Sequence, residues 1–442
     1  MGIGEKEMNI CVFGLWHLGL VTGACLAKLG HKVIGLDFDK SLVNDLQNGK
    51  TPLFEPGLNE LIAEEAQSGK LSFTSEAREA LSNAQVLWFA FDTPVNEDDV
   101  ADILFLEKNF NKIVSFLNNE TGIVFSSQAP VGFIGKMEKS FLKQRPDKKC
   151  YFACSPENLK LGRALDAFLN PDRIIIGVRN QESKEFFSPL FCSISDRLEW
   201  MKIESAEMTK HAINSFLAIS VCFANEIASI CEQLGAEAKE VERGLKTESR
   251  IGPKAYLSPG VAFSGGTLAR DINFLVKLSG KYKLPAYLIK AVNHSNSFHK
   301  SWIERKCRQF LGSFKKKTIA ILGLTYKPGT DTLRRSLAVE LAKSLHAKGA
   351  RVVGFDPVIK SIPEGLSKII WLKNNAREAM LDADVIIIVT KWPEFLQFGE
   401  DLINLMKNKL VIDPNGFIAN LVTCKNLNYI SVGKSFVKEG KK

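Results

Sequence analysis

A βαβ pattern near each end of the 442-residue chain constrains its fold more than any other feature. The first pattern has an apolar run at residues 9–13, a glycine turn and a helix of small residues, and then an apolar run at 32–36 closed by Asp37. A similar alternation restarts at Lys317, where its second apolar run is closed by Asp356. Strands alternating with helices form parallel sheets covered on both faces. We therefore expect an α/β fold with two Rossmann-like, doubly wound domains.

The middle of the chain has a different pattern, with helical periodicity and no strand-like run. Residues 286–310, which follow a proline and contain no glycine or proline, predict one long connecting helix. We expect an N-terminal domain at 8–200, a central helical segment at 201–312 that joins the two Rossmann-like domains, and a C-terminal domain at 313–442.

Charge and cysteine content limit the possible partners. The net charge is 58 − 49 = +9, spread along the chain, which suits anionic small molecules better than nucleic acid. Nine cysteines without a CxxC pair indicate a reducing compartment and predict no metal site. No apolar run reaches about 18 residues, the length of a membrane span, and the first residues do not form a signal peptide. We expect a cytoplasmic protein that binds neither membrane nor nucleic acid.

The first glycine turn has most of a dinucleotide-binding fingerprint. Asp37 lies 18 positions after the last glycine of the turn, where a carboxylate accepts hydrogen bonds from a ribose diol and favours NAD over NADP. The helix that follows offers free N–H groups to a pyrophosphate. Trp16 replaces the middle glycine, so a domain that binds no dinucleotide is the alternative. The predicted cofactor-binding residues here are Gly14, Leu15, Trp16, His17, Leu18, Gly19 and Asp37.

Further motifs occur along the whole chain. They are GKTPLFEPGL at 49–58, DTP at 92–94, SQAPVG at 127–132, SPENLKLG at 155–162, PDRI at 171–174, KPGTD at 327–331 and TKWPEF at 390–395. With these motifs the chain resembles the UDP-glucose/GDP-mannose dehydrogenase family over nearly its whole length. The DTP segment, together with Ala101 and Asp102, is similar to the family's G-T-P and A-D.

The resemblance implies oxidation of a nucleotide-sugar C6 alcohol to a carboxylate by two hydride transfers to NAD, with a place in polysaccharide biosynthesis. In the family a cysteine thiolate forms a thioester, a glutamate assists its hydrolysis, and a lysine, an asparagine and an aspartate position water and stabilise oxyanions. Lys210, Asn214 and Asp271 match the last three, and Glu157 matches the first glutamate of the family. The i, i+4 spacing of Lys210 and Asn214 places both on one helix face.

The covalent part of this apparatus is missing. Thr267 stands where the nucleophilic cysteine belongs, Leu161 replaces the second glutamate, and Gln128 replaces a threonine near the reacting water. A threonine hydroxyl needs a dedicated base to attack a carbonyl, so we expect no thioester step. Cys154 is better explained as buried packing than as a substitute nucleophile. The candidate catalytic residues are Lys210, Asn214, Asp271, Glu157 and Thr267.

The resemblance also implies further contacts. Thr93, Pro94 and Ser127 would contact the cofactor. The substrate-binding residues would be Lys160, Arg250, Tyr256, Ser258, Gly260, Phe263, Lys327 and Arg334, and relatives lend the arginine matching Arg250 across a homodimer interface. A homodimer that binds a UDP-sugar is therefore expected.

Three functions are compatible with these residues. The first, which the resemblance favours, is an NAD-dependent nucleotide-sugar oxidoreductase without the covalent step. The second is a redox-neutral epimerase that returns the hydride. The third is a catalytically silent paralogue that binds a sugar nucleotide. Net NADH production separates the first from the second, and absence of NAD binding would select the third.

Overall fold

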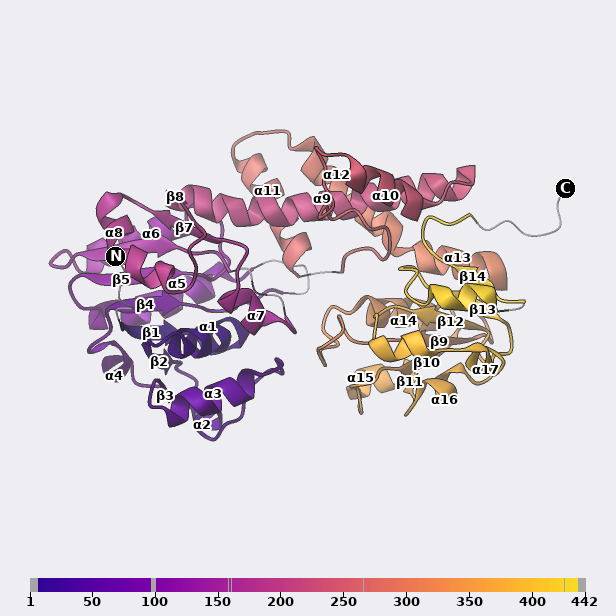
Figure 1. Cartoon of the computed structure of the whole chain (residues 1–442), viewed down its shortest axis with the longest axis horizontal. Helices are drawn as coiled ribbons and strands as arrows, with labels where there is room; N and C mark the ends of the chain where they lie inside the picture. The colour runs from indigo at the N-terminus through magenta and orange to yellow at the C-terminus, as the bar shows by residue number, and fades with distance from the viewer. Residues whose placement is uncertain are drawn as a thin grey trace. The chain divides into compact units, whose positions relative to one another are not determined.

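The computed structural model describes residues 7–96, 101–157, 159, 161–264, 266–424 and 426–435. The chain divides into two compact units, one ending at Ala212 and the other beginning at Ile213, and helix α9 (Ile203–Leu234) has residues in both. Lys160, a predicted substrate-binding residue, lies outside the described residues. Each unit is built on one sheet, coloured indigo to magenta in the first and orange to yellow in the second (Figure 1).

The first unit carries an eight-stranded sheet of order β3-β2-β1-β4-β5-β6-β7-β8 among the described residues. Its neighbouring strands run parallel except for β6 and β7, which are antiparallel. The strands are β1 (Asn9–Phe13), β2 (Lys32–Leu36), β3 (Leu71–Thr74), β4 (Val86–Phe89), β5 (Thr121–Phe125), β6 (Cys150–Cys154), β7 (Ile174–Val178) and β8 (Leu198–Lys202). The order reverses between β1 and β4, which is where doubly wound sheets bind ligands.

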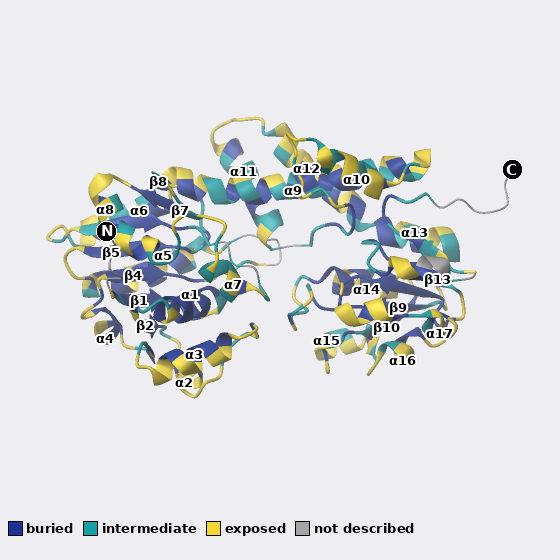
Figure 2. Ribbon diagram, viewed as in Figure 1, coloured by how far each residue is buried: buried dark blue, intermediate teal, exposed yellow. Residues whose placement is uncertain are grey.

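Helices cover this sheet because its central strands are apolar on both faces. Every residue of β4 and β5 is buried, and Figure 2 shows these strands in dark blue beneath helices with exposed outer surfaces. The helices are α1 (His17–Lys28), α2 (Lys40–Gln47), α3 (Leu58–Gln67), α4 (Ala77–Leu81), α5 (Ile103–Ile113), η1 (Val114–Phe116), α6 (Phe133–Gln144), α7 (Ala164–Leu169) and α8 (Gln181–Cys192).

The second unit repeats the same winding in a six-stranded parallel sheet of order β11-β10-β9-β12-β13-β14. Its strands are β9 (Thr318–Leu322), β10 (Arg351–Phe355), β11 (Ile370–Leu372), β12 (Val385–Ile388), β13 (Leu410–Ile412) and β14 (Asn428–Ile430). The helices around it are α14 (Leu337–Ala347), α15 (Glu364–Ser367), α16 (Ala376–Met380), η2 (Pro393–Gln397), α17 (Glu400–Ile403) and η3 (Ala419–Thr423). The predicted fold, two Rossmann-like sheets joined by a helical segment, is confirmed.

The prediction of one helix over residues 286–310 is wrong. The structure has two helices there, and the central helices after α9 are α10 (Ala238–Thr247), α11 (Thr267–Lys281), α12 (Tyr287–Lys300) and α13 (Trp302–Leu311). The break lies at Ser301, whose hydroxyl donates to the Phe298 carbonyl over 2.8 Å. A serine that bonds back to the preceding turn competes with continuation of the helix.

Among the described residues, α9 alone is long and apolar enough to cross a membrane, with a mean hydropathy of 1.5 in its most apolar window. Half of that window is buried inside the structure. Core helices of globular proteins meet the same criterion, and α9 carries the buried polar side chains Glu207, Asn214 and Asn225. These side chains fit a helix that packs within protein.

Candidate functional site

The glycine turn between β1 and α1 has the close approach that a dinucleotide turn needs. Gly14 has φ +100°, and a Cβ on Gly19 would lie 1.7 Å from the Gly14 carbonyl oxygen, so neither position accepts a side chain. Trp16 has φ −91° and ψ −154°, which any residue adopts. Its indole is 48% exposed. The turn therefore forms without the middle glycine because the backbone at Trp16 does not require one.

Two backbone N–H groups of this turn donate to carboxylates. The Leu15 amide lies 2.9 Å from Asp37 Oδ2, and the Leu18 amide lies 3.0 Å from Asp92 Oδ2. Asp37 also accepts the Asp39 amide at its other oxygen over 3.0 Å. The structure thus brings the predicted ribose acceptor to the predicted phosphate turn, and it adds Asp92, to which the sequence assigned no role.

The loops after β4 and β5 close the same end of the sheet. The Thr93 hydroxyl donates to the Gln128 carbonyl over 2.6 Å. The Ser127 hydroxyl oxygen is buried and has no hydrogen-bond partner within the described residues. Pro94 is exposed. A narrow glycine cradle, a carboxylate closing β2 and an orphaned hydroxyl together fit a bound NAD.

Glu55, which the sequence indicated only as part of a motif, is a buried residue that connects two segments of the candidate site. Its side chain is 1% exposed and accepts His17 Nε2 at 2.9 Å. It also accepts the Gly162 and Ala164 amides, each at 2.8 Å. Glu55 therefore ties the first residue of α1 to the loop that carries Glu157 and Leu161.

Lys210 and Glu157, two predicted catalytic residues, are in contact in the first unit. The Lys210 ammonium lies 3.2 Å from Glu157 Oε1 and also donates to the Glu157 carbonyl. Their side chains are 11% and 22% exposed. Glu157 thus holds the Lys210 ammonium in one place and sheltered from water, which a group that stabilises an oxyanion needs. Leu161 stands in the same loop at the position of the second family glutamate, so this position has no carboxylate.

Asn214 and Asp271 form the corresponding pair in the second unit. The Asn214 side-chain amide donates to Asp271 Oδ2, and Asp271 is fully buried. Thr267 is the first residue of α11, one turn before Asp271, and is exposed. Within the part of the chain that the structure describes, the Thr267 hydroxyl has no hydrogen-bonded base. The geometry is that of an unactivated hydroxyl.

The loop with Tyr256, Ser258, Gly260 and Phe263 is held by polar side chains that the sequence did not single out. Asn225 Oδ1 accepts the Gly260 amide at 3.0 Å, and the ring of His299 bonds the Gly260 carbonyl at 2.7 Å. Asn296 pairs with the Phe263 amide and carbonyl at 3.0 and 2.8 Å. A Cβ on Gly260 would lie 2.5 Å from Asn415 Oδ1, so a side chain at this position would displace the Asn415 amide.

The remaining predicted substrate residues lie at exposed or half-buried positions of the second unit. Tyr256 is 60% exposed, and the Ser258 hydroxyl donates to Glu242. The Arg250 side chain is 86% exposed and forms a salt bridge with Glu248 at 2.9 Å. A pair this exposed contributes little to stability. Arg334 is exposed and Lys327 is half-buried on the loop after β9. The adjacent Arg335 has φ +59° and lies 3.8 Å from the Cβ position of Gly266, which sets this loop beside the start of α11.

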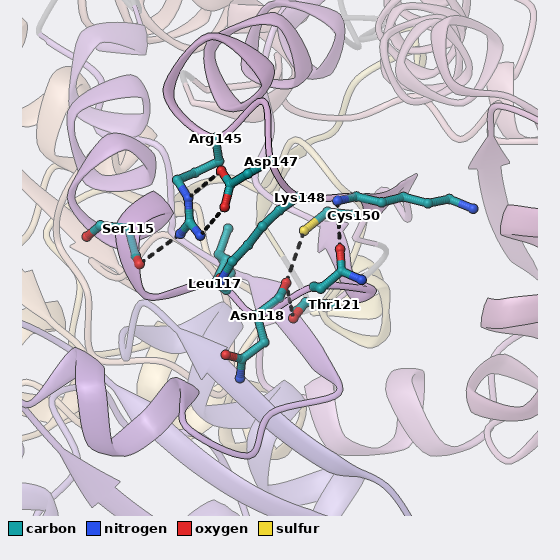
Figure 3. Close-up of polar contacts among 10 residues, drawn as sticks. Ser115, Leu117, Asn118, Thr121, Arg145, Asp147, Lys148 and Cys150 are labelled. Atoms are coloured by element: carbon teal, nitrogen blue, oxygen red, sulfur yellow. Dashed lines mark hydrogen bonds and ion pairs between the residues drawn. The ribbon is translucent and has the colours of Figure 1, made fainter.

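All nine cysteines lie among the described residues and are free thiols. Burial raises the pKa of Cys154 well above its usual range and that of Cys150 to about 11. Cys150 is the more exposed of the two, and its thiol donates to the Asn118 carbonyl at 3.6 Å (Figure 3). Its basic neighbours are engaged, because Lys148 donates to the Leu117 carbonyl and Arg145 pairs with Asp147. Neither thiol replaces the missing nucleophile.

Comparison with known proteins gives the same assignment along the whole chain. Sequence models of the UDP-glucose/GDP-mannose dehydrogenase family match as its NAD-binding domain at residues 8–195, its central domain at 204–298 and its UDP-binding domain at 320–420. UDP-glucose 6-dehydrogenase of Rhizobium meliloti (strain 1021) is 33% identical over 97% of this chain and 100% of the relative. UDP-glucose 6-dehydrogenase TuaD of Bacillus subtilis (strain 168) is 32% identical over 97% of this chain and 94% of the relative.

A solved UDP-glucose dehydrogenase from Pyrobaculum islandicum superposes with a TM-score of 0.89 at 27% identity, covering 98% of this chain and 100% of that one. The UDP-D-ManNAc dehydrogenase from Pyrococcus horikoshii shares the fold, with a TM-score of 0.85 at 23% identity and coverage of 97% and 100%. The chain therefore belongs to the UDP-glucose/GDP-mannose dehydrogenase family, and its cofactor is NAD.

Proposed function

We propose that this protein oxidises a UDP-sugar with NAD and does so without a covalent thioester. The observation that carries this proposal is the combination of two retained polar pairs, Lys210–Glu157 and Asn214–Asp271, with a nucleophile position occupied by an unactivated Thr267 hydroxyl. NAD, when bound, accepts the hydride. The chain's own groups act on the sugar: the Lys210 ammonium stabilises oxygen as it gains negative charge, and the Asn214 amide holds Asp271 in one orientation.

The proposed reaction ends after one hydride transfer or continues slowly through the aldehyde hydrate. A hydrate supplies its own hydroxyl, so it needs neither a thiolate nor an enzyme-bound intermediate. The Asp271 carboxylate is a candidate acceptor for the hydrate proton. The second oxidation is expected to be slow because a nucleophile with a depressed pKa is lacking.

We also propose that the active form is a cytoplasmic homodimer. Large apolar side chains are exposed on the part of α9 in the second unit and on α12, among them Phe216 at 68%, Leu234 at 76% and Tyr287 at 81%. Exposed apolar patches of this kind mark protein interfaces. Light scattering at micromolar concentration tests the assembly, and a monomer would contradict it.

The test of the reaction is incubation with NAD and a panel of UDP-, GDP- and TDP-sugars, with NADH absorbance and product mass measured together. One NADH per UDP-sugar, with an aldehyde as the first product, is the expected result. Fast formation of two NADH per sugar would contradict the proposed loss of the covalent step. An isomerised sugar without net NADH would favour the epimerase, and absence of NAD binding would favour a silent paralogue.

A further inference from the structure

The Leu18 amide is already occupied in the protein's own structure. Leu18 is the second residue of α1, and its N–H is one of the first four of the helix, which have no partner inside the helix. Asp92, on the loop after β4, accepts this N–H at 3.0 Å. The Leu15 amide likewise donates a hydrogen bond to Asp37 Oδ2 over 2.9 Å. Two donors of the turn that should face a pyrophosphate therefore face carboxylates.

These two uses of the Leu18 amide exclude one another. The positive end of the α1 dipole attracts an anion, and the Asp92 carboxylate makes this interaction when no cofactor is bound. A pyrophosphate at the same amide would lie next to the Asp92 carboxylate, and the two negative charges would repel one another. The competing carboxylate belongs to this chain's own sequence, which has aspartate at position 92.

We propose that Asp92 is a residue that sets cofactor affinity: its carboxylate competes with the cofactor's pyrophosphate for the Leu18 amide and must turn away before the cofactor binds. The inference rests on the assignment of NAD to this turn. It follows that Asp92 weakens every ligand that places a diphosphate on the turn and leaves a ligand without phosphate unaffected. The residue acts as a determinant of binding, separately from the chemistry at Lys210 and Asp271.

The experiment compares the full-length protein with Asp92→Gly and Asp92→Asn, and titrates NAD, ADP-ribose and adenosine by calorimetry. Asp92→Gly should lower the Kd for NAD and for ADP-ribose about tenfold, the range expected when a carboxylate is removed from a helix N-terminus and from the side of a bound anion. Asp92→Asn, which keeps an acceptor and loses the charge, should fall between. The Kd for adenosine should not change.

A matched control is Asp147→Asn, because Asp147 lies in the loop before β6, at the edge of the parallel strands opposite to the glycine turn, and forms a salt bridge with Arg145 at 3.1 Å. It removes one negative charge away from the glycine turn and should leave the Kd for NAD unchanged. Hydrogen exchange of the ligand-free protein gives a second readout, in which the Leu18 amide should exchange faster in Asp92→Gly than in the native chain.

Equal or weaker binding of NAD by Asp92→Gly, with adenosine still bound by both proteins, would overturn the role of Asp92 and leave the cofactor site in place. Failure of the native chain and of Asp92→Gly to bind either NAD or adenosine would remove the cofactor assignment and this inference together. Unchanged exchange at Leu18 would also overturn it, since the carboxylate would then not hold that amide in solution.

Discussion

At the scale of single residues, Glu55 links two functional segments that are far apart in sequence. Its buried carboxylate accepts the His17 ring and the amides of Gly162 and Ala164. The sequence showed Glu55 inside a motif, yet its partners could not be predicted, because His17 lies 38 positions away and Gly162 and Ala164 lie 107 and 109 positions away, and the winding of the sheet brings them together. The same holds for Asp92, whose contact with Leu18 depends on the loop after β4.

Replacing Glu55 should therefore destabilise the first unit. Glu55→Ala leaves buried donors without an acceptor and should lower the free energy of unfolding by about 3 kcal/mol. Thermal or urea unfolding of the full chain measures this, with Glu60→Ala, at an exposed position of α3, as the control. Equal transitions for Glu55→Ala and the native chain would show that these hydrogen bonds contribute little.

His299 should make the stability of the folded chain depend on pH. Burial lowers the pKa of His299 below its ordinary value, against the opposing effect of its hydrogen bond to the Gly260 carbonyl. The unfolded chain therefore protonates His299 more readily than the folded chain does. The contribution of the neutral ring to stability is complete above the unfolded pKa of about 6.5 and is lost as the pH falls through the lower pKa of the folded chain. The loop at Gly260 should loosen over the same range.

His299→Gln should flatten this dependence. Unfolding is followed between about pH 7 and about pH 5, a range that spans the ordinary pKa of histidine. The variant should lose less stability over this range than the native chain. An identical slope for His299→Gln and the native chain would contradict the assignment to His299.

At the scale of elements, the period of apolar residues predicted the strands that form the two βαβ units, and the structure confirms β1, β2 and β10 at the expected residues. Short edge strands such as β3 and β11 were not predicted, because four- and three-residue runs carry little periodic signal. The division of residues 286–310 at Ser301 was also missed, since a side-chain hydrogen bond rather than a glycine or proline ends α12.

Helix α1 allows a sharp test of the turn, because it contains two glycines in different surroundings. A Cβ on Gly19 would meet the Gly14 carbonyl at 1.7 Å, whereas a Cβ on Gly23 would have its nearest neighbour at 3.6 Å. Gly19→Ala should abolish measurable NAD binding and destabilise the unit. Gly23→Ala should keep NAD binding and change stability by at most about 1 kcal/mol, with helix propensity favouring alanine. Calorimetric NAD titration of both variants decides this, and tight binding by Gly19→Ala would contradict the placement of the cofactor.

At the scale of the whole molecule, the predicted catalytic residues are distributed along the sequence of both units. Glu157 and Lys210 belong to the first unit, and Asn214, Thr267 and Asp271 belong to the second. The family resemblance could predict these residues one by one, since each sits in a local motif. It could not predict how each pair is held, because the Lys210–Glu157 and Asn214–Asp271 contacts join positions 53 and 57 residues apart.

The last prediction tests whether the residue at position 267 limits the second oxidation. Thr267→Cys together with Leu161→Glu supplies a nucleophile and a hydrolytic acid/base, so the double variant should raise the yield of the second NADH and of uronic acid from UDP-glucose. Each single change should do little, because the two groups serve successive steps and their effects are not additive. Thr267→Ser with Leu161→Glu is the matched control, since its hydroxyl does not ionise near neutral pH. The native chain should form no thioester, and iodoacetamide should not inactivate it at position 267. Fast formation of two NADH per UDP-glucose by the native chain would contradict the prediction and would show that Thr267 does not limit the second oxidation.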